Sequence, residues 1–268
     1  MATRRLAIVV VAAAIGAAGV AGAATGGRGR RSPAPARRAV AAAAAGVPEP
    51  ARPAFAVPAP RLLQGAAAGS RWAPVRRATV ARAGPRADAP AVARVAAGTP
   101  EGTTNLVVVV GEAERGGRTW DRVRLATLPN GRLGWVPRRA LGGYHFVHTR
   151  LVVDRARLEV TLLRGGTPVF RAPAGVGRPA SPTPPGVFYV RDRVTSLHDP
   201  FYGPVAFGTS ARSAALTEWP GGGFIGIHGT DRPDLLPGRV SHGCIRMRNA
   251  DIVRLARLMP IGTPVVVR

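Results

Sequence analysis

The chain has 268 residues, of which 46% are hydrophobic, so it can bury the core of one medium-sized or two small domains. Its formal net charge is +24, and because no lysine occurs, all 38 basic side chains are arginine. This charge favours polyanionic surroundings such as nucleic acid, anionic lipid or wall polymers. The sequence has no zinc-finger spacing, RNP motif or basic heptad pattern, so nucleic acid is not an expected partner.

The N-terminal residues 1–24 resemble a targeting segment. Arg4 and Arg5 precede an uncharged apolar run, residues 6–24, which ends in small residues. This order is typical of a secretory signal, while the length of the run is close to the minimum for crossing a bilayer. We therefore expect either a cleaved signal peptide or a retained anchor in the cytoplasmic membrane. Both alternatives predict an exported protein of the cell wall or periplasm.

Residues 25–70 are rich in Pro, Ala, Gly and Arg, and Glu49 is their only acidic residue. Repeated prolines such as those in PEPARPAFAVPAP block both helices and sheet ladders. We predict a disordered basic linker, which could lie against anionic wall polymers.

Residues 71–143 contain short apolar runs separated by turns, a pattern typical of a small β-barrel. Asn130-Gly131, between two alternating segments, predicts a two-residue hairpin. The stretches RAGPRADAPAVARVAAG, TWDRVRL and GWVPRRAL resemble bacterial SH3-like domains. That resemblance implies an accessory module that binds a ligand or the cell wall.

Residues 146–268 are again rich in predicted strands, and Gly165-Gly166 predicts a hairpin turn. One helix is expected near the end, with Asn249 as its cap, Asp251 in its first turn, and Pro260 after it. The run TPVVV, residues 263–267, predicts a final buried strand. The expected fold is mainly β, with one short C-terminal helix.

Cys244, in the stretch SHGCIRMRN, is the only cysteine, so it cannot form an intrachain disulfide. Three uses of its thiol remain open: burial as a small apolar side chain, zinc binding together with histidines, and nucleophilic catalysis. Electropositive neighbours could lower the thiol pKa. His228, at the end of the run FIGI, is the better candidate for a base, because His242 is expected to point away from the thiol. Gly243 would let backbone amides approach a substrate as an oxyanion hole.

The stretches IHGT and SHGCIRM resemble the signature of the L,D-transpeptidase (YkuD) catalytic domain family, an upstream His followed by Ser/Thr-His-Gly-Cys, an apolar residue and Asn or Arg. The loop SPTPPGVF, residues 181–188, is also similar to the family pattern. The matching residues are His228, Ser241, His242, Gly243, Cys244, Ile245 and Arg246. The resemblance implies a small SH3-like β-barrel, residues 71–143, followed by a mostly β YkuD-type catalytic domain, residues 146–268.

The family resemblance implies a role for each matching residue. Cys244 would be the nucleophile, His228 the proton donor and acceptor, and the Gly229 carbonyl would orient the imidazole. The implied oxyanion and substrate residues are Ser241, His242, Gly243 and Arg246. No metal and no cofactor is implied.

The implied reaction joins peptidoglycan stem peptides. The Cys244 thiolate would attack a tetrapeptide stem and release D-Ala, and an amine of a second stem would resolve the thioester into a 3→3 crosslink. With water as the acceptor the same site would be an L,D-carboxypeptidase. Carbapenems are implied covalent inhibitors. A wall-hydrolase cysteine peptidase usually has Cys before His, the reverse of the order here. A sortase-like enzyme would have its His well upstream and a later catalytic Arg in another strand, which does not fit SHGCIR. A non-catalytic wall-binding protein stays an alternative.

Overall fold

The computed structural model describes residues 69–195, 199–215 and 223–268, all of which belong to one compact unit, Pro60–Arg268. The predicted signal or anchor, residues 1–24, and residues 25–68 of the predicted linker lie outside the described residues. In the part that is described, no helix has the length and apolar character required to cross a membrane.

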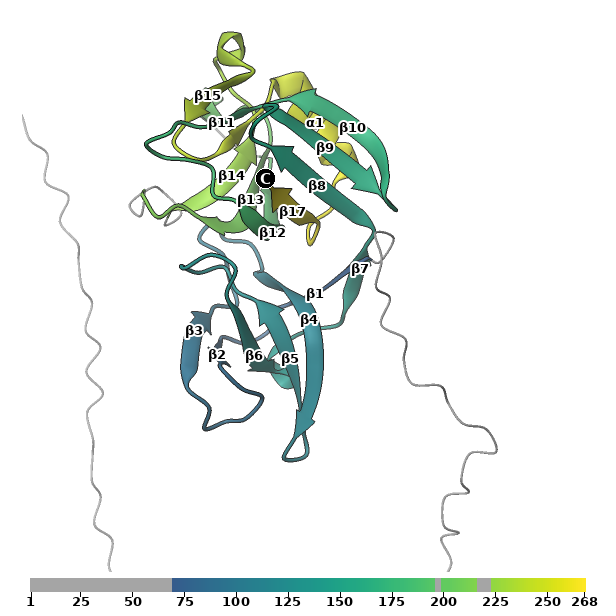
Figure 1. The fold of residues 1–268 in the computed structure, drawn as a ribbon. Coiled ribbons are helices and arrows are strands. Elements are labelled where there is room, and N and C mark those ends of the chain that lie inside the picture. The colour runs from purple at the N-terminus through teal and green to yellow at the C-terminus, as the bar shows by residue number, and fades with distance from the viewer. Residues whose placement is uncertain (1–68, 196–198, 216–222) are drawn as a thin grey trace, which may run out of the picture. The chain divides into compact units, whose positions relative to one another are not determined.

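The N-terminal part of the described chain is a seven-stranded sheet in the order β3-β2-β6-β5-β4-β1-β7 (Figure 1). Small aliphatic side chains such as Val75, Val107, Val123 and Val136 form its core, and β-branched residues of this kind favour strands. The resemblance of this region to SH3-like domains stays a prediction. The strands are β1 (Ser70–Pro74), β2 (Thr79–Arg82), β3 (Ala91–Val95), β4 (Leu106–Arg115), β5 (Arg118–Arg124), β6 (Leu133–Pro137) and β7 (His145–Val147), and a 3₁₀ turn, η1, spans Arg138–Ala140.

The first sheet extends further along the chain than predicted. Strand β7 pairs antiparallel with β1, with Ser70 opposite Val147, so the predicted domain start at residue 146 lies inside a strand of the first sheet. The second sheet begins at Thr149. The run HFVHTRLVVD therefore divides between two sheets because His148 interrupts it, a break that alternating hydrophobicity does not reveal.

The C-terminal part is a ten-stranded sheet in the order β10-β9-β8-β17-β12-β13-β14-β16-β11-β15 (Figure 1). Strand β12 pairs with β17 along its first half and with β13 along its second half, so it joins two parts of the sheet around one buried core. The strands are β8 (Thr149–Asp154), β9 (Glu159–Arg164), β10 (Thr167–Pro173), β11 (Gly175–Gly177), β12 (Gly186–Val194), β13 (Ala206–Arg212), β14 (Phe224–His228), β15 (Gly238–Ser241), β16 (Ile245–Arg246) and β17 (Pro264–Val267). Two 3₁₀ turns are η2 (Pro200–Tyr202) and η3 (Pro233–Leu235).

Of the two predicted hairpin turns, one is confirmed. Gly165 and Gly166 join β9 to β10 with φ angles of 57° and 91°, the left-handed conformation that favours glycine at both positions. Asn130-Gly131 is instead part of a longer loop, closed by a hydrogen bond from the Leu125 amide to the Arg132 carbonyl. The Asn130 side chain bonds both the amide and the carbonyl of Arg212, so a long-range contact determines this loop.

The predicted C-terminal helix is confirmed as α1 (Asn249–Leu258), and Ile252 and Leu255 bury its apolar face. The predicted cap is wrong. Arg248 occupies the N-cap position and no side chain caps the helix. Asn249 instead accepts a hydrogen bond from the Thr230 amide at 2.9 Å, next to the predicted base.

A small apolar cluster connects the two sheets. Leu106 and Val108 from β4 pack on Tyr189 of β12, with Trp72 and Ile261 at the edge of the cluster. The Tyr189 hydroxyl donates to the carbonyl oxygen of Leu106 at 3.3 Å. Next to it, the indole ring of Trp72 covers Gly262, which has a φ of +80°.

We predict that Gly262→Ala strongly destabilises the protein. An added methyl group would enter the Trp72 ring, and the positive φ would also be strained, so the free energy of unfolding should fall by about 3 kcal/mol. Gly131→Ala is the matched control, because Gly131 has a φ of +86° and open space around it, and it should cost about 1 kcal/mol. Urea denaturation measures both losses. Equal losses would contradict close packing of Trp72 on Gly262.

Candidate active site

Cys244 immediately precedes strand β16, which runs parallel to β14. The register pairs Ile227 with Ile245 and His228 with Arg246, so Cys244 lies beside Gly226. The Gly226 amide donates a hydrogen bond to the Cys244 Sγ at 3.3 Å. The chain thus holds its single thiol at a strand start, with a backbone donor directed at the sulfur.

His228 ends strand β14 and is only 1% exposed. Its Nδ1 lies 2.7 Å from the Gly229 carbonyl oxygen. A carbonyl can only accept, so Nδ1 must carry the proton and the neutral ring has a bare Nε2. Within the described residues Nε2 has no hydrogen-bond partner, and is therefore available as a proton acceptor.

Gly226 keeps space open between the thiol and the imidazole. A methyl group placed on Gly226 would lie 3.6 Å from His228 Cδ2 and 3.9 Å from Cys244 Sγ, so both side chains border the same point. Gly226 and His228 are two residues apart on β14 and therefore face the same side of the sheet. The absence of a side chain at Gly226 lets the base and the thiol share that side.

The pKa shifts of the thiol and the imidazole both favour the neutral form at pH 7. Burial lowers the pKa of His228 to about 4, and the Arg246 guanidinium acts in the same direction. Burial also raises the pKa of the Cys244 thiol above its usual value, and this outweighs the opposing effects of the Gly226 amide and Arg246. The prediction that electropositive neighbours lower the thiol pKa is therefore wrong. The free energy lost when the thiolate is removed from water exceeds the stabilisation that the Arg246 guanidinium gives it.

Ser241 holds the turn that carries the cysteine. Its hydroxyl donates to the Cys244 carbonyl at 2.6 Å and accepts from the Gly243 amide at 3.1 Å. Thr183, in the loop after β11, donates to the Gly243 carbonyl at 2.7 Å. Gly243 has a φ of +123°, a conformation that favours glycine. Both polar contacts of Ser241 are thus used within the turn, and the Gly243 amide is already bonded.

The two remaining predicted residues differ in their exposure to solvent. His242 is exposed, and its Nε2 lies 3.0 Å from a guanidinium nitrogen of Arg178. Arg246 is 8% exposed and stacks on Phe201, with its Cζ 4.3 Å from the ring centroid. Arg246 therefore lies among the side chains around His228, whereas His242 faces solvent.

Two ring contacts of His228, and one contact of the backbone that follows it, were not predicted from the sequence. The rings of Phe201 and Tyr202 pack on the imidazole at centroid distances of 5.9 Å and 5.1 Å. Asn249 fixes the backbone just after it through the Thr230 amide. The predicted helix start drew attention to Asn249 but gave it a different partner, and nothing in the sequence distinguished Phe201 or Tyr202.

A cavity of about 410 Å³ opens beside the dyad and reaches both Cys244 and His228. Its far side carries two carboxylates, Glu101 from the loop between β3 and β4 and Asp192 from β12. Arg191 contacts both, at 3.1 Å and 3.4 Å, and burial raises the pKa of Asp192. Among the described residues, no three His, Cys, Asp or Glu side chains come together as metal ligands would.

We predict that Asn249 positions His228. Its Oδ1 binds the Thr230 amide and packs where Gly203 and Gly229 meet, so losing it should release the Gly229 carbonyl from the imidazole. Asn249→Ala should slow alkylation of Cys244 by iodoacetamide at pH 7 by about 10-fold, since small displacements of a catalytic group are costly.

Asn249→Asp is the matched control, because it keeps an acceptor oxygen, and it should react within about threefold of the wild type. A rate unchanged in Asn249→Ala would show that the Thr230 contact does not set the position of the imidazole.

The L,D-transpeptidase catalytic domain (YkuD) family model matches residues 148–267. A curated relative from Bacillus subtilis (strain 168), named YkuD and described as a candidate L,D-transpeptidase, is 36% identical over 95 residues, which cover 35% of this chain and 51% of the relative. YqjB from the same organism, with the same description, is 46% identical over 46 residues, 17% of this chain and 26% of the relative. The chain thus spans about half, or less, of the length of these relatives.

A solved structure of a mutant L,D-transpeptidase from Enterococcus faecium is 25% identical, with a TM-score of 0.36, over 45% of this chain and 50% of that chain. A similarity of this size carries no structural argument. The family-model match, residues 148–267, includes Cys244, His228 and the strands that hold them. Residues 148–267 are therefore similar to the YkuD family of L,D-transpeptidase catalytic domains, whose members are cysteine-dependent acyltransferases.

Proposed function

We propose that this protein is a peptidoglycan L,D-transpeptidase that forms 3→3 crosslinks through an acyl-enzyme on Cys244. The observation that carries the proposal is the bare Nε2 of a buried, neutral His228, which borders the same point as the Cys244 thiol. The Nδ1 contact to the Gly229 carbonyl supports the role of Gly229 as the group that orients the imidazole.

Acylation starts from a neutral pair. Because the thiol pKa is raised and the His228 pKa is lowered, a standing thiolate–imidazolium pair is disfavoured, and the proton should move to Nε2 as Sγ attacks the stem carbonyl. The tetrahedral intermediate then collapses, His228 returns the proton to the leaving amine, and D-Ala departs. A thioester to Cys244 remains.

Deacylation reverses these roles. An amine of a second stem attacks the thioester, His228 Nε2 takes a proton from it, and the thiol leaves after receiving that proton. The acyl group moves from sulfur to nitrogen, so the proposed reaction needs neither a metal nor a nucleotide as a reactant. With water in place of the amine, the same steps release a tripeptide.

The turn around Cys244 offers a backbone hydrogen-bond donor to the oxyanion. The Gly243 amide already donates to Ser241, so the Cys244 amide is the better candidate donor to the developing charge. Arg246, stacked on Phe201, lies close enough to lower the pKa of both dyad members and would also favour negative charge at this point.

We also propose binding partners and a cellular location for this protein. A carbapenem carbonyl would be attacked by the same thiol, so we expect carbapenems to acylate Cys244. The protein would be exported to the cell wall or periplasm, and its basic residues 25–70 would hold it near anionic polymers. The region of the first sheet would bind the wall as an SH3-like accessory module.

The test follows intact-protein mass and products after incubation with a disaccharide-tetrapeptide. The wild type should show an acyl adduct, free D-Ala and a crosslinked dimer, and Cys244→Ala should lose all three by at least about 1,000-fold. Gly226→Ala should fold, since its new contacts of 3.6–3.9 Å are ordinary, but the methyl group should slow acylation by about 10- to 100-fold.

Gly111→Ala is the control for Gly226→Ala, because its methyl group would make one ordinary contact, with Arg122 Cβ at 3.6 Å, in strand β4. It should acylate like the wild type. Tripeptide without dimer would assign the protein as a carboxypeptidase. A folded wild-type protein that forms no adduct and releases no D-Ala would overturn the proposal in favour of a non-catalytic wall-binding protein.

A further inference from the structure

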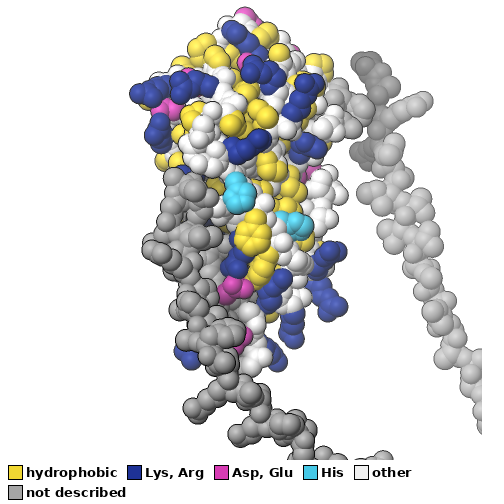
Figure 2. All heavy atoms as spheres, turned by 90° about the vertical axis from the view of Figure 1, so that its right-hand side faces the viewer, with side chains coloured by type: hydrophobic (Ala, Val, Ile, Leu, Met, Phe, Trp, Pro, Cys, Tyr) yellow, Lys and Arg dark blue, Asp and Glu magenta, His cyan; other side chains and the backbone are white. Residues whose placement is uncertain are grey.

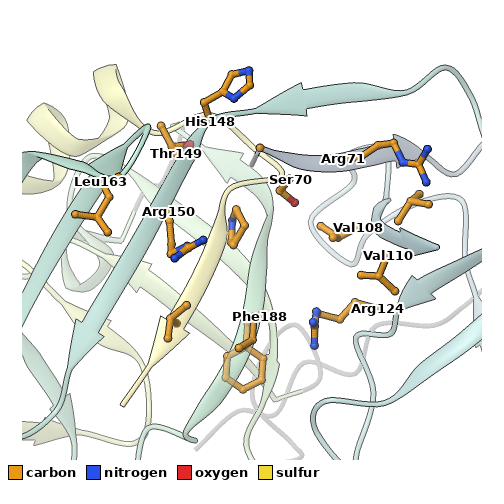
Figure 3. A pocket seen from close by; sticks show the side chains of 16 residues that line it. Ser70, Arg71, Val108, Val110, Arg124, His148, Thr149, Arg150, Leu163 and Phe188 are labelled. Atoms are coloured by element: carbon orange, nitrogen blue, oxygen red, sulfur yellow. The ribbon is translucent and has the colours of Figure 1, made fainter. Parts of the chain in front are cut away.

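A second cavity, of about 490 Å³, lies apart from the thiol and includes neither Cys244 nor His228 in its lining (Figure 3). Strands of both sheets contribute to it. Its apolar part includes Val108 of β4 and Phe188 of β12, together with Val110 and Val187, which are 44% and 41% exposed. Large exposed aliphatic side chains in one hollow offer a contact surface to a ligand with an apolar face.

Two arginines point into this cavity from opposite sides, Arg124 at the end of β5 and Arg150 on β8 (Figure 3). Both are partly buried, and burial lowers the pKa of Arg124. None of the described residues that line the cavity is Asp or Glu. Neither arginine forms an ion pair or side-chain hydrogen bond with any residue in the described ranges, so their charges are uncompensated.

The other basic side chains around the cavity are arranged differently. Arg71 is paired with Glu112 at 2.8 Å and lies over the Tyr144 ring, and in Figure 3 its guanidinium points away from Arg150. His148 is exposed and also points outward in this view. The free positive charge inside the cavity therefore comes from Arg124 and Arg150.

Removing a guanidinium from water without a counter-charge costs free energy, and proteins offset that cost with a carboxylate or a bound anion. Guanidinium groups bind phosphate and carboxylate through paired, charge-assisted hydrogen bonds. We infer that the Arg124–Arg150 cavity binds an oxyanion, a phosphate or a carboxylate, carried on a small body whose apolar face rests on Val108, Val187 and Phe188.

The high net charge offers a competing explanation for anion binding, because a protein of +24 would attract anions over its whole surface. Figure 2 shows basic side chains at many places on the part of one face that is not covered by grey atoms, with few carboxylates among them. The control therefore removes two positive charges from the same sheet but outside the cavity. Arg118 and Arg122 are exposed residues of β5, the strand that carries Arg124, and lie outside the cavity.

The experiment measures binding of two probes by isothermal titration calorimetry to the full chain: a glycerol phosphate oligomer, and muramyl dipeptide as a carboxylate. Salt is kept at about 0.15 M, where charges more than about 8 Å apart are screened. R124Q/R150Q should lose at least about 10-fold in affinity for whichever probe binds, whereas R118Q/R122Q should change it by less than about twofold. Circular dichroism and the alkylation rate of Cys244 show whether each variant is folded.

Binding of the phosphate probe alone would identify a phosphodiester as the source of the oxyanion, and binding of muramyl dipeptide alone a carboxylate. Either result supports the site if the loss is specific to R124Q/R150Q. Equal losses in the two double variants, or no binding of either probe to the wild type at millimolar concentration, would overturn the inference.

Discussion

The hydrogen bond from His228 Nδ1 to the Gly229 carbonyl is the contact on which the site depends. It fixes the tautomer of a ring that is 1% exposed, and so leaves Nε2 without a hydrogen-bond partner among the residues that the structure describes. The carbonyl stays in place because Asn249 holds the next amide in the chain, that of Thr230. Helix α1 thus acts on the base through a side chain at its first turn. A backbone carbonyl takes the position that a carboxylate occupies in a Ser-His-Asp triad.

The use of a carbonyl in place of a carboxylate has an electrostatic consequence. A carboxylate beside Nδ1 would favour the imidazolium, whereas a neutral carbonyl in a buried site does so weakly, and burial lowers the pKa of His228 to about 4. In the proposed mechanism, the thiol then stays protonated until the stem carbonyl arrives. A neutral thiol is a poor nucleophile toward oxidants and adventitious electrophiles. Under the proposed mechanism, the resting pair would therefore be protected and would react only when proton transfer and attack are coupled.

The local sequence predicted what depends on local chemistry. The spacing of SHGCIR and IHGT predicted a pairing of Cys244 with His228, and the structure places both side chains beside Gly226. Two glycines at 165 and 166 predicted a tight turn correctly. The failures involve contacts between distant residues. Asn130 bonds Arg212 instead of forming a two-residue hairpin, and Asn249 bonds Thr230 instead of capping a helix. The thiol pKa was also misjudged, because burial depends on the packed structure and not on neighbours in the chain.

The most direct measurement of the central claim is an NMR titration of the ¹⁵N-labelled His228 imidazole in the free protein. A neutral ring with the proton on Nδ1 should persist from pH 8 downward, and proton uptake should be centred near pH 4. His228→Gln would assign the signal. An imidazolium at pH 7, titrating together with a Cys244 thiolate, would contradict the account and show that the dyad rests as an ion pair.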